Sequence, residues 1–445
     1  MSALDPSRLT ASEAADAIAA GRLTSLDLAE ACLARIAQRD EDVLAWTHLD
    51  PEFALRQARA ADVAQKAGAH LGPLHGVPVG IKDIIDVVGL RCEHGSPIFA
   101  GRVPETDAAS VRALKSAGAV ILGKTVTTEL ANRTARQTRN PHNAAHTPGG
   151  SSSGSAAGVA DFQMPLALGT QTAGSVIRPA SFCGVHAIKP TLGLIPRTGA
   201  LLQSHTLDTI GVYGRSVEDL ALALDVLAIE DASDSVSFSR ARMDYRKSIG
   251  DADPKALRLA FVRSPVWEKA EPSMQKALEG FAQSLGVVCT TVNFSQKFDR
   301  ALAWHGVVMG AEGAHYYGPL VDTHPGKLSA FLTERIAAGR KMTAADYIEA
   351  IEAREVFYAE VAAVLGNYDA ILTPASAGVA PKDLTFTGDP VFNSIWTYLG
   401  VPCVNLPLLK VDGMPLGVQL IGRRREDARL LATARALEAV VGPNS

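Results

Sequence analysis

The chain has 445 residues, of which 47% are hydrophobic and 20% charged; this is typical of a globular protein with a large core and excludes a disordered one. The formal net charge is −4 and no run of lysine or arginine stands out, so neither nucleic acid nor an anionic membrane is an expected partner. Five cysteines without CxxC or metal-ligand spacing indicate a reducing compartment, and we therefore expect a cytoplasmic protein.

The sequence carries no pattern typical of membrane targeting or insertion. Residues 1–20 contain acidic and hydroxyl side chains among alanines, without the basic flank and apolar stretch of a signal peptide. The most apolar stretches, such as residues 119–122, are far shorter than the roughly 20 residues that span a bilayer. We expect neither a signal peptide nor a transmembrane segment.

The hydrophobic pattern at the start of the chain predicts helices followed by a βαβ unit. Residues 10–13 have the form of a capping box and open a helical pattern, and a second helix is expected at 25–38. A β-branched apolar stretch at 76–85, a helical segment at 107–117 and a strand-like segment at 119–122 follow. Strand, helix and strand in this order predict a βαβ unit.

The second half of the chain continues the alternation. A helix is expected at 217–229, and the polar segment at about 230–254 is expected to be an irregular surface excursion. The elements expected after it are a strand at 257–262, a helix at 272–285 and strands at 287–292, 369–374 and 402–407. We predict an α/β fold, a single large domain over residues 1–445 whose central mixed β-sheet is covered by helices on both faces.

The run from Gly149 to Ser155 is the first candidate motif. A flexible linker would separate domains, but the run is followed at once by small residues at 156–160 that suit the close packing of a helix. A phosphate-binding Walker loop would end in Gly-Lys-Ser or Gly-Lys-Thr, which this run lacks. A catalytic loop is the third interpretation, and the run alone does not decide among the three.

The second candidate motif places a lone serine, Ser175, after the small-residue turn at 169–174. Such a turn can expose several backbone N–H groups together, as a developing oxyanion requires. The alternative is an ordinary turn or helix-capping serine, which is the commoner role of this residue type.

A general base for a serine nucleophile is not found among the histidines. None stands in the GxSxG setting of an α/β-hydrolase or in an HExxH motif. Lys82 interrupts an otherwise apolar strand, and burial of a lysine lowers its pKa and can leave the neutral amine that accepts a proton. The alternative is a lysine paired with Asp83 or Asp86 at the end of a strand, and composition alone leaves both interpretations open.

Three segments together resemble the amidase signature family of Ser-cisSer-Lys amide hydrolases, in its compact bacterial form. Content, order and spacing of the motifs all agree, and the resemblance is dense over residues 74–220 and sparser elsewhere. The segments are Gly80-Ile81-Lys82-Asp83, the run from Gly149 to Ser155, and Gly174-Ser175 followed by Ile177-Arg178-Pro179-Ala180.

The resemblance implies an amidase that needs no metal or organic cofactor and acts on a small molecule with an amide-type carbon–nitrogen bond. Ser175 would be the nucleophile that forms the acyl-enzyme, Ser151 the bridging serine and Lys82 the base. A cis peptide bond is implied on one side of Ser151, at Gly150-Ser151 or at Ser151-Ser152. The implied oxyanion hole consists of the backbone N–H groups of Thr172, Ala173, Gly174 and Ser175.

Three positions depart from the family pattern. Ala173 stands where a glycine is usual and would narrow the floor of the pocket by a methyl group, and Gln171 stands where many members have an acid. Arg178 lies one place later than the usual arginine. It could clamp a substrate carboxylate, but a structural ion pair beneath the catalytic loop is the favoured interpretation.

The resemblance also implies further candidates for substrate contact, because their positions correspond to segments that line the pocket in the family. For each of them, packing is the more common role. With Arg178 they are Thr128, Glu129, Asn132, Gln203, His205, Trp304 and Trp396.

Other functions remain as alternatives. The amidase subunit of a tRNA-dependent amidotransferase would need partner subunits and a glutamine pocket, and residues 127–131 do not match the Asn-Met-Asp-Glu-Phe phrase of those subunits. Hydrolysis of carbamates, ureides or hydrazides could use the same residues, whereas a non-catalytic scaffold would not need Lys82, Ser151 and Ser175 together. A homodimer is the base-rate expectation for a soluble enzyme of this size.

Overall fold

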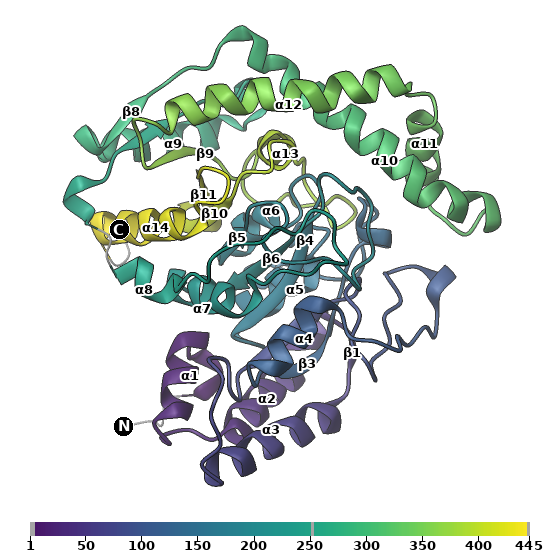
Figure 1. Cartoon of the computed structure of the whole chain (residues 1–445), viewed down its shortest axis with the longest axis vertical. Helices are drawn as coiled ribbons and strands as arrows, with labels where there is room; N and C mark the ends of the chain where they lie inside the picture. The colour runs from purple at the N-terminus through teal and green to yellow at the C-terminus, as the bar shows by residue number, and fades with distance from the viewer. Residues whose placement is uncertain (1–4, 251–252, 443–445) are drawn as a thin grey trace.

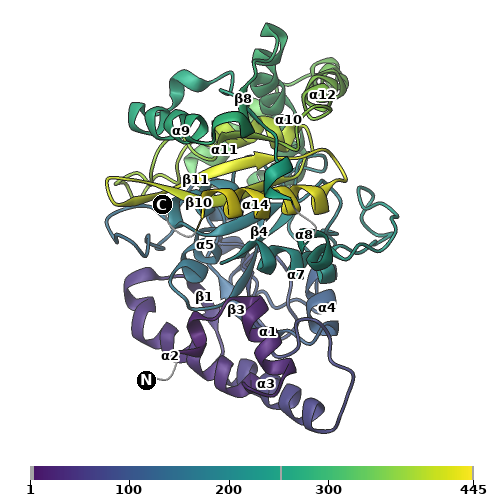
Figure 2. The same cartoon turned by 90° about the vertical axis from the view of Figure 1, so that its left-hand side faces the viewer.

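The computed structural model describes residues 5–250 and 253–442 and is built around one mixed sheet (Figures 1 and 2). The 11 strands have the spatial order β1-β3-β2-β4-β6-β5-β10-β11-β9-β7-β8. β2 pairs in parallel with β3 and β4, β7 pairs in parallel with β8 and β9, and the other pairs are antiparallel. The strands are β1 (Trp46–Leu49), β2 (Pro78–Lys82), β3 (Val120–Thr125), β4 (Leu166–Gln171), β5 (His186–Lys189), β6 (Thr209–Gly214), β7 (Leu259–Phe261), β8 (Cys289–Thr291), β9 (Ala370–Pro374), β10 (Cys403–Val411) and β11 (Met414–Ile421).

Helices cover the sheet on both sides. In Figure 1, α10, α11 and α12 lie together at one end of the molecule, and α1, α2 and α3 lie at the opposite end, as Figure 2 also shows. The α-helices are α1 (Ala11–Ala19), α2 (Ser25–Val43), α3 (Pro51–Lys66), α4 (Ala109–Ser116), α5 (Ser153–Ala160), α6 (Ile177–Cys183), α7 (Val217–Leu227), α8 (Tyr245–Gly250), α9 (Pro272–Ser284), α10 (Ala301–Thr323), α11 (Ala330–Gly339), α12 (Ala344–Val364), α13 (Val391–Tyr398) and α14 (Asp427–Val441).

Alternation along the strands explains why the sheet needs cover on both faces. Successive side chains of a strand point to opposite faces. In β9, Ala370 and Leu372 pack in one hydrophobic cluster with α7, α9 and α14, whereas Ile371 between them packs with α10, α12 and α13. The strand is therefore apolar on both faces, and the predicted single α/β domain with a mixed, doubly covered sheet is confirmed.

Most of the elements expected from the sequence are present. The capping box at Thr10 begins α1, and β2, α4 and β3 form the predicted βαβ unit with parallel strands. The segment at about 230–254 is not irregular throughout, as was expected: it contains α8, which packs against α7 and α14. The sequence prediction did not include α10 to α13 or β11; the strand expected at 402–407 is the first half of β10.

The sheet brings the candidate motifs together. β2 and β4 are parallel neighbours, so their carboxyl ends lie at the same edge, where Lys82 ends β2 and the 172–176 loop follows β4. Ser151 lies just before α5, and Ser175 lies just before α6. Among the helices of the described residues, none has the length and apolar character needed to cross a membrane.

Candidate active site

Lys82 and Ser151 are hydrogen-bonded inside the protein. The Lys82 side chain is 0% exposed, and its Nζ lies 2.7 Å from Ser151 Oγ and 2.8 Å from Thr170 Oγ1. Both partners are neutral hydroxyls. Complete burial lowers the pKa of the Lys82 amine well below its ordinary value, and the negative charge of Asp208 only partly opposes this. Burial therefore favours the neutral form of the Lys82 amine, within hydrogen-bond distance of Ser151 Oγ.

The alternative interpretation of Lys82, an ion pair at a strand end, is wrong. Asp83 faces another buried lysine, Lys124, with 3.6 Å between Nζ and Oδ1. Asp86 pairs with Arg102 at 2.7 Å. Both acids that follow Lys82 along the chain therefore have other cationic partners, and among the described residues Lys82 Nζ forms hydrogen bonds only with hydroxyl groups.

The peptide bond between Gly150 and Ser151 is cis, which decides between the two positions that the sequence left open. The carbonyl oxygen of Ser151 accepts a hydrogen bond from the backbone N–H of Thr128 at 3.2 Å. The Ser151 side chain is buried and faces Lys82.

Ser175 is partly exposed and lines a cavity of about 280 Å³ together with Thr172 and Ala173. Its carbonyl oxygen accepts a hydrogen bond from the hydroxyl of Tyr213 at 3.1 Å. Within residues 5–250 and 253–442, Ser175 Oγ has no hydrogen-bond partner. Its hydroxyl is consequently free to meet a molecule in the cavity.

The 172–175 loop has the features of an oxyanion hole. Across the described part of the chain, none of its four backbone N–H groups donates to another protein group. The Thr172 carbonyl oxygen lies 3.0 Å from Nε2 of His305, and the Ala173 carbonyl oxygen accepts from the Thr397 hydroxyl at 2.7 Å. In a planar trans peptide the C=O of one residue and the N–H of the next point in opposite directions. The N–H groups of Ala173 and Gly174 therefore point away from His305 and Thr397.

Two departures from the family pattern are accommodated in this loop. The Gln171 amide oxygen accepts the backbone N–H groups of Val176 and Ile177 at 2.8 and 3.0 Å, which holds the start of α6. The Ala173 backbone stays outside the left-handed region, and its side chain lines the cavity. Glycine is required at position 174, because a Cβ there would lie 2.5 Å from Asn393 Oδ1.

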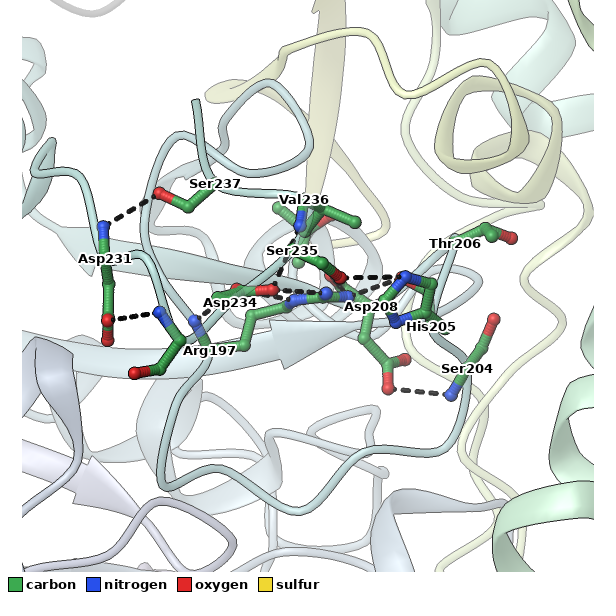
Figure 3. Close-up of polar contacts among 12 residues, drawn as sticks. Arg197, Ser204, His205, Thr206, Asp208, Asp231, Asp234, Ser235, Val236 and Ser237 are labelled. Carbon is green, nitrogen blue, oxygen red and sulfur yellow. Dashed lines mark hydrogen bonds and ion pairs between the residues drawn. The ribbon is translucent and has the colours of Figure 1, made fainter. Parts of the chain in front are cut away.

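Asp208 connects this loop to the next one. Its carboxylate accepts hydrogen bonds from the Thr172 hydroxyl and from the backbone N–H groups of Gln203 and Ser204, the latter two at 2.6 and 2.9 Å. Figure 3 shows the bond to Ser204. Burial raises the pKa of Asp208, against the effect of the hydrogen bonds that it accepts. One carboxylate therefore holds both the 172–175 loop and the cavity wall at Gln203.

A buried ion pair between Arg197 and Asp234 holds the 203–208 loop on its other side. The Arg197 guanidinium lies 2.7 Å from Asp234, and its Nη1 donates to the carbonyl oxygens of His205 and Asp208 at 2.7 and 3.2 Å. Figure 3 shows Arg197 directed at Asp234 and His205 directed at Ser235. The 203–208 loop is thus held from two sides.

Arg178 is not part of an ion pair among the described residues, which corrects the favoured interpretation of this residue. Its guanidinium donates to the carbonyl oxygens of Thr387 and Gly150 at 2.7 and 2.6 Å, and Nη1 has no partner in the described part of the chain. Burial lowers the pKa of Arg178 to about 9, and the positive charge of Arg133 acts in the same direction. Arg178 lines the cavity, where an anion would compensate its charge.

Three of the eight candidate substrate contacts, Asn132, Arg178 and Gln203, line the cavity. The others lie elsewhere among the described residues. Thr128 supports the backbone around Ser151 and Asn132, Glu129 accepts from Ser329 at the start of α11, His205 points to Ser235, Trp304 lies under Arg300, and Trp396 is enclosed in a hydrophobic cluster with Phe298.

Five polar residues of the cavity were missed from the sequence: Arg133, His305, Arg335, Asp389 and Ser394. His305 immediately follows the candidate Trp304, so a helical pattern drawn for α10 would have placed the two side chains on different faces. Arg335 lies on α11, and its guanidinium donates to the Asn132 side chain. No local motif marks Arg335 or Asp389, because both come to the cavity only through the packing of distant segments.

Comparison with known proteins agrees with this geometry. The chain matches the family model described as Amidase over residues 27–431. It is 34% identical over 470 residues to a glutamyl-tRNA(Gln) amidotransferase subunit of Chloroflexus aggregans, with 97% of this chain and 96% of that protein covered.

Two solved structures show the same architecture. A structure from a vestigial protein complex that reveals the evolutionary origins of an s-triazine catabolic enzyme has a TM-score of 0.90 and 29% identity, covering 97% of this chain and 98% of that one. The peptide amidase PAM, in complex with the competitive inhibitor chymostatin, has a TM-score of 0.84 and 30% identity, with 97% of each chain covered. The chain therefore belongs to the amidase signature family.

Proposed function

We propose that this protein hydrolyses an amide-type carbon–nitrogen bond of a small anionic molecule through an acyl-enzyme on Ser175. The observation that carries the proposal is the buried contact of 2.7 Å between Lys82 Nζ and Ser151 Oγ, at the edge of the sheet where the Ser175 loop begins. A buried amine whose hydrogen-bond partners are two hydroxyl groups suits a general base.

In the proposed reaction, Ser151 and Lys82 together take the place of the single histidine base of other serine hydrolases. Neutral Lys82 accepts the proton of Ser151, which accepts that of Ser175 as Ser175 Oγ attacks the carbonyl carbon. The N–H groups of the 172–175 loop stabilise the oxyanion of the tetrahedral intermediate. The proton returns through Ser151 to the leaving nitrogen, and water then hydrolyses the acyl-enzyme.

The charge of the cavity supports an anionic substrate. Arg133, Arg178 and Arg335 line it, with Asp389 as the acidic side chain among its lining residues. Burial lowers the pKa of Arg335 to about 10, as it lowers that of Arg178, so a carboxylate in the cavity would stabilise both charged guanidinium groups. A cavity of about 280 Å³ suits a small molecule.

The curated relatives support a second candidate, the subunit of an amidotransferase that releases ammonia for a partner subunit. The relative from Chloroflexus aggregans carries the name of such an enzyme and matches nearly the whole chain. A cavity with arginines and Asp389 could hold the carboxylate and ammonium groups of free glutamine. This candidate requires partner subunits, whereas hydrolysis of amides, carbamates, ureides or hydrazides does not. The five free cysteines fit a cytoplasmic location for either.

Serine-directed labelling tests the proposal. The full chain is incubated with a fluorophosphonate, its mass is measured intact and after peptide mapping, and turnover is assayed on primary amides, anilides, carbamates, hydrazides and glutamine. We expect one adduct, on Ser175, and turnover of carboxylate-bearing members of the panel without any partner. Turnover of glutamine alone, increased by a partner subunit, would favour the second candidate.

Substitutions of the three proposed catalytic residues provide the matching controls. Ser175→Ala should abolish labelling, and Lys82→Met and Ser151→Ala should each lower kcat by about 10⁴-fold or more, with non-additive effects in combination. Thermal melting identifies variants that fail to fold. An adduct on another residue, or near-wild-type turnover by folded Lys82→Met, would contradict the mechanism.

A further inference from the structure

Gln203 has a buried, unpaired amide and belongs to the wall of the cavity. Its side chain is 2% exposed, and neither its Oε1 nor its Nε2 has a hydrogen-bond partner among the described residues. The residue lines the same cavity as Ser175. A buried polar group without a partner is costly, so an amide with both atoms unpaired beside a catalytic serine indicates a ligand that supplies both partners.

The backbone that carries this amide is firmly held. The N–H groups of Gln203 and Ser204 both donate to Asp208, and the Ser204 hydroxyl donates to Glu312 of α10. Figure 3 shows the Ser204 backbone directed at Asp208. Because the loop is fixed, the Gln203 side chain cannot leave the cavity wall by a movement of its backbone without breaking these bonds.

The chemistry of an amide determines what it recognises. The edge of Gln203 offers one acceptor and one donor in a plane, so its complement is a group with a donor and an acceptor on one edge: a primary amide, a ureido group or an imide. Arg178 and Arg335 line the same cavity, and guanidinium groups suit a carboxylate.

We propose that Gln203 is a specificity residue, and that the substrate carries, besides the bond that is cleaved and an anionic group, a second planar carbonyl–N–H group that pairs with the Gln203 side chain. This inference rests on the proposed function and narrows its substrate class. Free glutamine has one amide, which is the one cleaved, and so leaves Gln203 unpaired. A site built to hydrogen-bond a polar group discriminates strongly against an analogue that lacks it.

A set of three matched carboxylates tests the inference. Ureidoacetate has the full amide edge, N-acetylglycine lacks the terminal NH₂ group, and 4-methylpentanoate has the same shape with no polar edge. Each is titrated against the fluorophosphonate labelling of Ser175 in the full chain, and the protection constant is measured for wild type, Gln203→Leu and His205→Ala. His205 is the control because it lies on the same loop but points to Ser235, away from the cavity.

We expect ureidoacetate to protect wild type and His205→Ala at least about tenfold better than 4-methylpentanoate, with N-acetylglycine between them, and we expect this preference to vanish in Gln203→Leu. Equal protection by the three compounds in wild type, or an unchanged preference in Gln203→Leu, would overturn the inference. If Gln203→Leu does not fold, Gln203→Met takes its place.

A second readout separates this inference from the proposed function. The rise in melting temperature caused by each carboxylate is measured in the same variants, and it does not depend on a reactive serine. Absence of Ser175 labelling with the ureidoacetate preference intact would reject the acyl-enzyme and retain the binding role of Gln203. Normal labelling without the preference would do the reverse.

Discussion

At the scale of single residues, the charge of Asp208 acts on the proposed base. Asp208 is the acid whose negative charge opposes the effect of burial on the pKa of Lys82. The charges that face Asp208 itself include Arg197, which lowers its pKa. Lys82 can act only when neutral, so activity of the wild type should fall as the pH is lowered through the pKa of Lys82.

Asp208→Asn should therefore move the acidic limb of the kcat/KM profile to lower pH, because the charge that raises the pKa of Lys82 is removed. The maximal kcat should also fall, since the amide of Asn cannot accept all the hydrogen bonds from Thr172, Gln203 and Ser204. Asp83→Asn is the control: Asp83 faces Lys124, and its loss should leave the limb in place. An acidic limb that does not move, or that moves to higher pH, in Asp208→Asn would contradict the proposed effect of Asp208 on the pKa of Lys82.

At the scale of elements, the 172–175 loop is hydrogen-bonded to helices that are remote in sequence. α10 supplies His305 to the Thr172 carbonyl, and α13 supplies Thr397 to the Ala173 carbonyl. Burial lowers the pKa of His305 to about 4, so its ring is neutral at physiological pH. Because the acceptor is a carbonyl oxygen, Nε2 carries the proton in the assigned tautomer.

His305→Phe removes this donor and frees the Thr172 peptide to rotate. We expect kcat to fall about 10- to 100-fold, since misplacing catalytic groups by about 1 Å has effects of this size. His305→Gln retains an N–H donor and should recover part of the rate, and Trp304→Phe, one position away and off the cavity, should leave kcat nearly unchanged. Steady-state kinetics that gave the same kcat for all three variants would rule out a positioning role.

At the scale of the whole molecule, two of the helices that line the cavity, α10 and α13, are held to the sheet by one hydrophobic cluster. Trp396 of α13 is 1% exposed in this cluster, with Phe294 and Phe298 at centroid distances of 6.3 and 6.2 Å. The cluster joins α10, α12 and α13 to strands β7, β9, β10 and β11. Because α10 and α13 also line the cavity, we expect a loss of packing in this cluster to disturb the cavity wall.

Trp396→Ala should lower the free energy of unfolding by about 3–5 kcal/mol, because it leaves a large cavity in this cluster. Trp396→Phe should cost less. Denaturant unfolding measures the loss, and kinetics well below the melting temperature should give a KM close to that of the wild type in Trp396→Phe. A large rise in KM without loss of stability would instead restore Trp396 as a substrate contact.

Local features of the sequence account for the elements that could be predicted. The capping box at Thr10 and the alternation of strand and helix patterns depend on residues close together in the chain, and they predicted α1, β2, α4 and β3 correctly. The β10–β11 hairpin was missed although Asp412-Gly413 is a strong signal for its turn, in which both residues have positive φ. The long α10 was missed because its apolar residues are not confined to one face.

The amino-acid sequence alone was enough to predict the amidase signature family, the doubly covered mixed sheet and the three residues proposed for catalysis, because each of these depends on short motifs or on periodicity along the chain. The folded structure was needed to establish that Lys82 contacts hydroxyls, that Arg178 binds carbonyls, and that Gln203 lies unpaired in a cavity with Arg335. Whether a group is charged, and whether it finds a hydrogen-bond partner, depends on its burial and on residues from distant segments. No local pattern in the sequence shows which distant segments come into contact.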